Sequence, residues 1–257
     1  MVLGLIALVA GLPVNTPAQD PAPLAHGKVP GELHHHLKIE NEYVRAYYVE
    51  VPPHQATELH EHDHDYIYIS LGPADVVSAV REKPEIRLEL KDGETHFTRG
   101  GFAHVARNLG DTPFRNVTIA LLKPQGEVKN LCAQIALDAA RGGCDETRGS
   151  VGGGPGFSVE PQMETREASL DLIRVDPQPR GVGVAVPPGT LIVVLKDSEV
   201  QIDVKGKPAK TLHGGEMTWI DAGSPGVTSN PSGWVSSYLQ LSLKAAARPS
   251  ARRRRPW

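Results

Sequence analysis

Two stretches of the chain consist of short runs in which apolar and polar residues alternate. In the first stretch, residues 42–122, glycine, proline or aspartate interrupts these runs about every eight to twelve residues. A period of two puts one face of each strand against a core and the other outward. The pattern predicts short antiparallel strands of a sandwich or barrel in YVRAYYVEV, DYIYISL, DVVSAV, IRLEL, THFTRG and NVTIALL.

The second strand-rich stretch, residues 158–244, is separated from the first by a different pattern. In residues 129–143, KNLCAQIALDAARGG, the apolar residues Leu131, Ile135 and Ala139 have helical spacing, and glycines follow. The next segment, DETRGSVGGGPG, has the composition of a flexible linker. We therefore expect residues 129–157 to form a connector with a short helix. Strands resume in SLDLIRV, TLIVVL, EVQIDV, MTWIDA and WVSSYLQLSL.

The two stretches share a spaced pattern of residues. Within sixteen residues, GETHFTRGGFAHVARN and GEMTWIDAGSPGVTSN match at two glycines and at their final asparagine. The matching positions are each 122 residues apart, and identical spacing over such a length favours an internal repeat. The sequence thus predicts a duplicated domain, with these pairs at equivalent positions: Gly93 and Gly215, Gly101 and Gly223, His104 and Gly226, Asn108 and Asn230.

The ends of the chain differ from these stretches. Residues 1–18 contain an apolar run of signal-peptide length that is too short to span a bilayer, although no Lys or Arg precedes it. We predict a signal peptide, a secreted or periplasmic protein and no stable membrane insertion after cleavage. Residues 19–37 read as an extended lead-in, and residues 245–257, which end in ARRRRPW, as a basic disordered tail.

Charge and cysteine content narrow the function classes. The 257 residues suffice for two domains, and 27 basic against 30 acidic residues give a net charge of −3, which argues against a nucleic-acid partner. Cys132 and Cys144 both lie in the connector. In an oxidising compartment they could form a disulfide, whereas a zinc site would need further ligands that the connector lacks.

The segment HEHDHDY, residues 60–66, is the main candidate for chemistry. In a strand, His60 and His62 project to the same face and could offer two imidazoles to one ion. His64 would join them if the strand continued. If the chain turns at residues 63–64, Asp65 could face the ion instead, so His64 remains the alternative to Asp65.

These residues resemble the metal-binding motifs of the cupin superfamily. His60-x-His62, followed by Asp65 and, six residues later, Gly72, resembles the first motif, and the pattern of Gly93, Gly101, His104 and Asn108 resembles the second. The sequence departs from the family pattern at His54 and Arg99, in the shorter gap before the acid, and in Asp replacing Glu.

The resemblance implies an all-β fold of two tandem cupin barrels of the jelly-roll type, residues 38–128 and 158–244. It implies that His60, His62, Asp65 and His104 hold one divalent transition metal, and iron, manganese, nickel, zinc and copper all suit such ligands. The second barrel has Ala185, Pro187, Thr190 and Gly226 at the ligand positions and should bind no metal. Packing, dimerisation or shaping the mouth of the first barrel is its expected role, so a homodimer is possible.

The function expected on this basis is that of a metal-dependent enzyme with a small-molecule substrate, an oxygenase in preference to an isomerase. The alternative is a non-catalytic module that binds a small ligand or metal. A proton-transfer group that is not itself a ligand would favour an enzyme, and the candidates are His64, His96 and Tyr68. The run His34, His35 and His36 is interpreted as an exposed polar patch.

Overall fold

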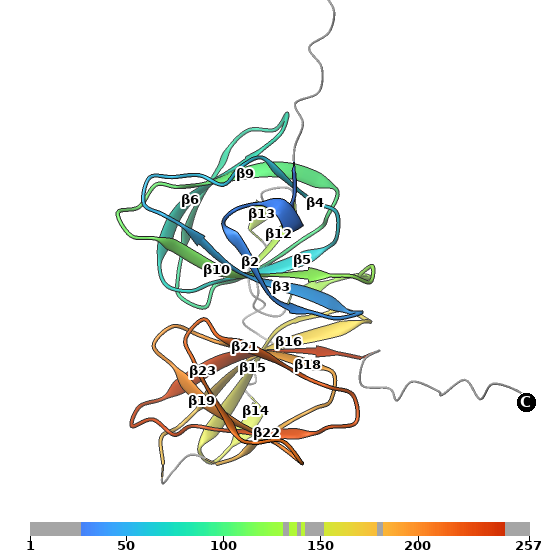
Figure 1. The fold of residues 1–257 in the computed structure, drawn as a ribbon, viewed down its shortest axis with the longest axis vertical. Coiled ribbons are helices and arrows are strands. Elements are labelled where there is room, and N and C mark those ends of the chain that lie inside the picture. Colours follow the sequence, from blue (N-terminus) through green and yellow to red (C-terminus); the bar gives the residue numbers. More distant parts are fainter. Residues whose placement is uncertain (1–26, 131–133, 138–139, 142–151, 179–181, 245–257) are drawn as a thin grey trace, which may run out of the picture.

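The protein consists of two β-barrels. The structure is a computed structural model, and it describes residues 27–130, 134–137, 140–141, 152–178 and 182–244. Figure 1 shows the first barrel, in blue to green, stacked on the second, in yellow to red. Within the described ranges, the helical structure is limited to one 3-10 turn, η1 (Val29–Gly31), so no helix there has the length and apolar character needed to cross a membrane.

The first barrel is built from two sheets. In the five-stranded sheet the order is β1-β4-β9-β6-β7, and in the seven-stranded sheet it is β13-β12-β8-β5-β10-β3-β2. The strands are β1 (Gly27–Lys28), β2 (His35–Glu40), β3 (Val44–Val51), β4 (His60–His62), β5 (Tyr66–Ser70), β6 (Ala74–Val80), β7 (Ile86–Leu90), β8 (Thr95–Thr98), β9 (Phe102–Asn108), β10 (Phe114–Leu121), β12 (Gln134–Leu137) and β13 (Ala140–Arg141).

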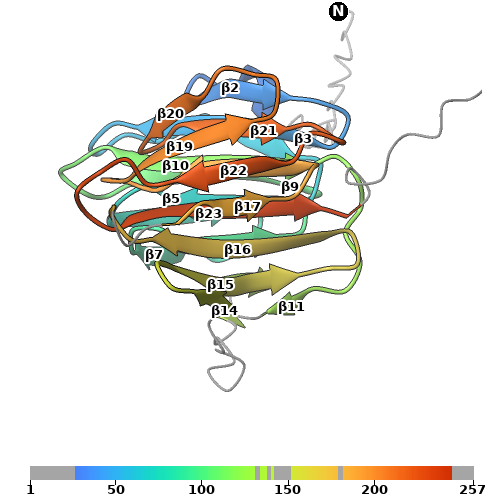
Figure 2. The same ribbon diagram turned by 90° about the horizontal axis from the view of Figure 1, so that it is seen from below.

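The second barrel repeats this architecture. Its larger sheet has the order β11-β15-β16-β23-β18-β21, with β14 beside β15, and its smaller sheet has the order β17-β22-β19-β20. Figure 2 shows β15, β16 and β23 side by side. The strands are β11 (Lys129–Asn130), β14 (Gly152–Gly154), β15 (Phe157–Glu164), β16 (Ala168–Val175), β17 (Val184–Val186), β18 (Thr190–Val194), β19 (Glu199–Val204), β20 (Lys210–His213), β21 (Met217–Ile220), β22 (Gly226–Ser229) and β23 (Ser236–Leu243).

The predicted helix in the connector is wrong. The described parts of residues 129–143 form three short strands, of which β12 runs parallel to β8 and pairs with β13. An unpaired sheet edge exposes a row of backbone donors and acceptors, and β12 satisfies those of β8. Edge pairing therefore overrides the helical spacing. Cys132, Cys144, residues 1–18 and the basic tail lie outside the described residues.

The internal repeat is confirmed by equivalent contacts in the two barrels. Asn108 donates its side-chain amide to the carbonyl groups of Val51 and Thr112, at 3.1 and 2.8 Å. Asn230 does the same with Val175 and Trp234, at 2.9 and 2.6 Å. Each buried asparagine thus ties the loop before the last long strand to the end of another strand. The shared asparagine is a structural residue of the repeat.

One hydrophobic core joins the barrels. Buried residues of β5, β8 and β10 in the first barrel belong to the same cluster as residues of β16, β18 and β23 in the second. Gly93 and Gly215 occupy equivalent positions at this junction. A Cβ on Gly93 would lie 2.8 Å from Leu195, and one on Gly215 would lie 3.2 Å from Leu71. The larger sheets therefore pack face to face, which leaves the barrel interiors separate.

The interior of the second barrel is filled with apolar side chains. Val184 and Val186 on β17 point into its core, together with Ile192, Val194 and Tyr238. These two valines stand on the strand equivalent to β4, whereas Ala185, the residue expected to match a ligand, is exposed. A one-residue difference in register accounts for this change, because neighbouring residues of a strand face opposite sides. The described interior of this barrel lacks a histidine cluster.

Candidate metal centre

Three of the predicted ligands converge inside the first barrel. His60 and His62 are the inward residues of β4, and Glu61 between them points away from the interior. Strand β9 runs antiparallel to β4, with His104 directly opposite His60. The Nε2 atom of His62 lies 3.2 Å from that of His60 and 3.2 Å from that of His104. Strand alternation and sheet register therefore bring together histidines that are 42 residues apart.

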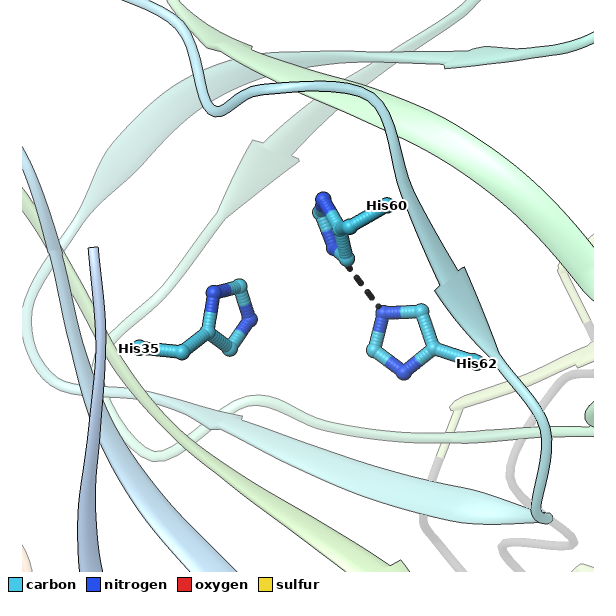
Figure 3. Close-up of side chains that lie close together, drawn as sticks. All are labelled: His35, His60 and His62. Atoms are coloured by element: carbon cyan, nitrogen blue, oxygen red, sulfur yellow. Dashed lines mark hydrogen bonds between the residues drawn. The ribbon is translucent and has the colours of Figure 1, made fainter. Parts of the chain in front are cut away.

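A fourth imidazole, that of His35, comes from β2. The ligand atoms of His35, His60 and His62 lie within 4.8 Å of one another. Figure 3 shows the three rings facing a common space. The side chain of His35 is 4% exposed, so this member of the predicted exposed patch belongs instead to the candidate site. His36 does remain exposed.

Most of these rings are held from behind at Nδ1. His60 Nδ1 lies 2.8 Å from the carbonyl oxygen of Glu58, to which it donates, and His104 Nδ1 lies 3.0 Å from Ser78 Oγ. His35 Nδ1 lies 2.5 Å from the carboxylate of Glu32. All three contacts orient their rings, and the acceptors of Glu58 and Glu32 also place the proton on Nδ1, which leaves Nε2 to act as the metal ligand.

Glu32 is the buried charge behind the site. Its side chain is 1% exposed and receives hydrogen bonds from the rings of both His34 and His35. The backbone N–H groups of His34 and Glu58 also donate to it. Burial alone would raise the pKa of Glu32, but the hydrogen bonds from His35 and His34 outweigh it and lower that pKa to about 2. Glu32 is therefore a carboxylate at neutral pH.

Burial keeps the converging imidazoles neutral. It lowers the pKa of His60 to about 4, with His35 adding to the effect. Burial and the nearby His60 lower the pKa of His104 to about 3. Burial also holds the pKa of His62 well below its usual value. The neutral form is the one that binds metal ions, so no proton has to be displaced from these rings at neutral pH.

The donor set fits a transition metal. Because His60 uses its Nδ1 proton on Glu58, its Nε2 carries a lone pair, and one proton on His62 Nε2 cannot be directed at both neighbours. A cation among the three nitrogens removes this conflict. Two nitrogens bound at about 2.1 Å are about 3.0 Å apart at a right angle and about 3.4 Å apart at a tetrahedral angle. The observed 3.2 Å, for the two pairs that share His62, lies between these values.

Asp65 does not lie with the histidines, contrary to the sequence prediction. Its carboxylate accepts hydrogen bonds from Arg99 at 2.8 Å, from the backbone of Gly100 at 3.1 Å and from the backbone of Gln125 at 3.2 Å. The next residue, Tyr66, lines the barrel interior, so Asp65 must face the opposite side of the strand. Asp65 ties a turn together and is not placed to bind the ion.

His64, the alternative to Asp65, is also directed elsewhere. Its side chain is 36% exposed, and its Nε2 lies 3.8 Å from Asp63. The turn that separates β4 from β5 removes His64 from the alternation that aligns His60 and His62. His54 is likewise on the surface, where it pairs with Asp111 at 2.9 Å.

A cavity of about 720 Å³ adjoins the histidines. His35, His60, His62 and His104 all line it. Its walls are largely apolar, and they include Val49, Val51, Val76, Leu88, Leu90 and Phe114. Pockets of this size and character accommodate small organic molecules.

Sequence reasoning missed two residues of the site, His35 and Glu32. The HHH run is the signal for His35, and it lies in the segment predicted to be an extended lead-in; the sequence carries no comparable signal for Glu32. Their role depends on two pairings: β1 runs parallel to β4, and β2 pairs with β3, with His35 opposite Val49. These pairings bring residues 27–37 onto the barrel and place His35 beside His60, at 4.8 Å between ring centroids.

Comparisons with known proteins identify the fold. No family model and no curated protein match the sequence. Among solved structures, AerE from Microcystis aeruginosa has a TM-score of 0.54 and 10% identity, covering 81% of this chain and 96% of that chain. Oxalate decarboxylase from Lactobacillus farciminis has a TM-score of 0.53 and 11% identity, covering 88% of each chain.

A third solved structure is described as a cupin barrel protein. The Cupin 2 conserved barrel domain protein from Leptotrichia buccalis has a TM-score of 0.51 and 11% identity, and the match covers 82% of this chain and 88% of that chain. At such low identity, the similarity concerns the fold alone. The match extends over both barrels of this chain, as does that of the decarboxylase. The chain has the tandem-barrel fold of the cupin superfamily.

Proposed function

We propose that the first barrel holds one divalent transition metal and that the protein is a metal-dependent enzyme with a small-molecule substrate. His60, His62 and His104 would be the core ligands, and His35 would supply a fourth imidazole. The observation that carries the proposal is the convergence of buried, neutral imidazole nitrogens at 3.2 Å spacing on the wall of a cavity.

The ligand set bears on the choice of metal. Imidazole suits zinc, copper, iron and nickel, whereas manganese prefers oxygen ligands. Because Asp65 binds Arg99, the histidine group lacks the predicted carboxylate ligand. We therefore favour iron, nickel, copper or zinc over manganese. Neutral His60, His62 and His104 would not offset the positive charge of the ion, which favours binding of an anionic oxygen of the substrate.

The cavity walls bear on the reaction class. A sugar would leave several hydroxyl groups without hydrogen-bond partners against Val49, Val76 and Leu88, and buried polar groups without partners are costly. An apolar substrate would lose nothing there. The walls therefore favour an oxygenase over a sugar isomerase. A bound redox-active metal would supply the electron-transfer and Lewis-acid chemistry that an oxygenase needs.

Metal binding is tested by stoichiometry and affinity. The wild-type protein should bind one equivalent of Zn²⁺ or Ni²⁺ in calorimetric titration, and a variant carrying both His60→Ala and His104→Ala should bind less than one tenth as tightly. Glu32→Gln should weaken binding by about tenfold or more, because His35 loses its charged partner. His213→Ala, on the surface of the second barrel, is the matched control. Equal binding by the wild type and the double variant would contradict the proposal.

Catalysis is tested separately, by oxygen uptake. The Fe²⁺-loaded and Ni²⁺-loaded proteins are presented with phenols, diketones and sugars, and the proposal expects uptake with an apolar member of the panel. Retained metal without any turnover or uptake would instead support a non-catalytic module that binds a small ligand.

A further inference from the structure

His96 occupies a second polar position in the cavity of the first barrel. It lies on β8, where His96 and Thr98 line the cavity and Phe97 between them packs into the core shared by the barrels. His96 is 1% exposed to solvent. Its alternation with Phe97 fixes the side of the strand from which the ring projects.

Glu94 determines which nitrogen of His96 carries the proton. His96 Nε2 lies 2.8 Å from a carboxylate oxygen of Glu94, whose side chain is 10% exposed. The carboxylate accepts the Nε2 proton, so Nδ1 is left with a lone pair. Nδ1 is buried and has no hydrogen-bond partner among the residues that the structure describes.

Tyrosine rings connect His96 with the metal centre. Tyr68 stacks on His96 with ring centroids 4.6 Å apart and planes 4° apart. Tyr66, on the same face of β5, stacks on His62 at 4.0 Å and 18°. The stacking restrains the His96 ring, because rotation would break both this contact and the hydrogen bond to Glu94. His96 is therefore a buried acceptor with a fixed orientation, in the same cavity as the candidate ligands.

We propose that His96 Nδ1 receives the hydroxyl hydrogen of a phenol-class substrate and acts as its proton acceptor. A buried acceptor nitrogen, on a residue that lines a largely apolar cavity, suits a molecule with an apolar body and one acidic hydroxyl group. In the transfer step the O–H bond breaks, an N–H bond forms at Nδ1, and the electron pair stays on the substrate oxygen. Nothing is oxidised or reduced in this step. Glu94 is a positioning residue that stabilises the resulting imidazolium.

This inference names the substrate class of the proposed enzyme and so rests on the proposed function. It also assigns separate roles to two groups of histidines. His60, His62 and His104 would bind the ion through Nε2, whereas His96 would bind the substrate through Nδ1, the atom that has no partner among the described residues. The two roles can be measured independently in the same sample.

Nitrogen-15 NMR of the full-length protein, labelled at histidine and loaded with Zn²⁺, tests the inference, with phenol and toluene as probes. We expect His96 to be the Nε2–H tautomer and phenol to shift its Nδ1 resonance, whereas toluene leaves it unchanged. The wild type should bind phenol about tenfold more tightly than toluene, because one buried hydrogen bond contributes about that difference in affinity.

The variants separate structure from recognition. His96→Phe, and His96→Leu should the first variant fail to fold, should reduce the preference for phenol to about twofold or less while toluene binding persists. Glu94→Gln should shift His96 toward a mixture of tautomers and lower the preference. His213→Phe, a control on the surface of the second barrel, should change neither.

Two results would overturn the inference: an Nδ1–H tautomer of His96 in the wild type, or an unchanged preference for phenol in the His96 variants. Zinc content is measured on every sample. Absence of zinc from the wild type would refute the proposed metal centre. The preference for phenol over toluene would still test the role of His96, because the tautomer of His96 and the binding of both probes are also measured on the metal-free protein.

Discussion

At the scale of single residues, most histidines of the candidate metal centre are held in position by a group behind the ring. The Nδ1 contacts are made with three different groups: the carbonyl of Glu58, the hydroxyl of Ser78 and the carboxylate of Glu32. Burial of the rings removes the competing protonated form, as the pKa of about 4 for His60 shows. The site is thus prepared for a cation by desolvation and by orientation together.

The substitution Asp65→Asn tests whether Asp65 is a metal ligand or a residue that stabilises a turn. The substitution should lower the free energy of unfolding by about 1–3 kcal/mol, because Arg99 and two backbone N–H groups lose a charged acceptor. The metal affinity should stay within about threefold of that of the wild type, because loss of a ligand or of a group that supports one typically weakens metal binding by about tenfold or more. Chemical denaturation and metal titration of the same variant give both numbers. A collapse of metal affinity with unchanged stability would contradict the assignment.

Asp171 on β16 predicts a pH dependence of stability in the second barrel. Burial, with a contribution from Glu164, raises its pKa from 3.8 to about 6. Because its pKa is higher in the folded state, Asp171 binds its proton more tightly there than in the unfolded state. The resulting stabilisation of the folded state is fully present below about pH 4 and is lost as the pH rises through about 6.

Asp171→Asn should therefore stabilise the protein at pH 7.5 by about 1–2 kcal/mol, with the partial exposure of the side chain reducing the effect, and should do little at pH 4. Urea denaturation at the two pH values measures this difference. Equal stability of variant and wild type at pH 7.5 would show that the carboxylate is not destabilising.

At the scale of elements, two turns of the first barrel lock the ligand strand in place. The N–H of Gly101 donates to the carbonyl of His62 at 2.6 Å, and a Cβ on Gly100 would lie 2.4 Å from the backbone of His64. The turn after β4 and the turn before β9 therefore touch through their backbones. The close approach requires glycine at position 100.

Gly100→Ala should force these turns apart. We expect a loss of about 1–3 kcal/mol in the free energy of unfolding and about tenfold weaker metal binding, because His62 would shift with its strand. Gly233→Ala, where nothing lies within 4 Å of the added Cβ, is the matched control. Thermal denaturation and metal titration should show lower stability and weaker metal binding for Gly100→Ala than for Gly233→Ala. Equal stability and affinity of the two variants would contradict the role of the contact between Gly100 and the backbone of His64.

The sequence predicted those elements whose signal is local. Alternation was enough to pair His60 with His62, and the spacing of glycines revealed the repeat. The position of Asp65 was mispredicted because spacing to Gly72 does not report the side of the strand that a residue faces after a turn. His35 was missed because its place depends on the pairing of β2 with β3. The helix expected near Ile135 failed because β8 offers an edge to pair with.

At the scale of the whole molecule, the shared core makes the second barrel part of the structure that supports the first. Phe97 and Ile69 of the first barrel and Leu191 and Leu241 of the second belong to one buried cluster. The interior of the second barrel is a separate cluster, which includes Ile202. Among the described residues, the second barrel thus supports the fold of the barrel that contains the candidate metal centre.

Leu241→Ala tests this coupling. The cavity left in the shared core should lower the free energy of unfolding by about 2–5 kcal/mol. Calorimetry should show one transition, moved to lower temperature, and the metal centre should be lost in that same transition. Two separate transitions, with the metal-binding barrel unchanged, would show that the barrels are energetically independent.

The central claim, a metal centre of imidazoles in the first barrel, is tested most directly by a crystal structure of the Ni²⁺-loaded or Zn²⁺-loaded protein with anomalous data at the metal edge. The account predicts one peak at about 2.0–2.2 Å from the Nε2 atoms of His60, His62 and His104, with His35 as the fourth ligand and Asp65 still bound to Arg99. A peak coordinated by Asp65, or none in this barrel, would contradict it.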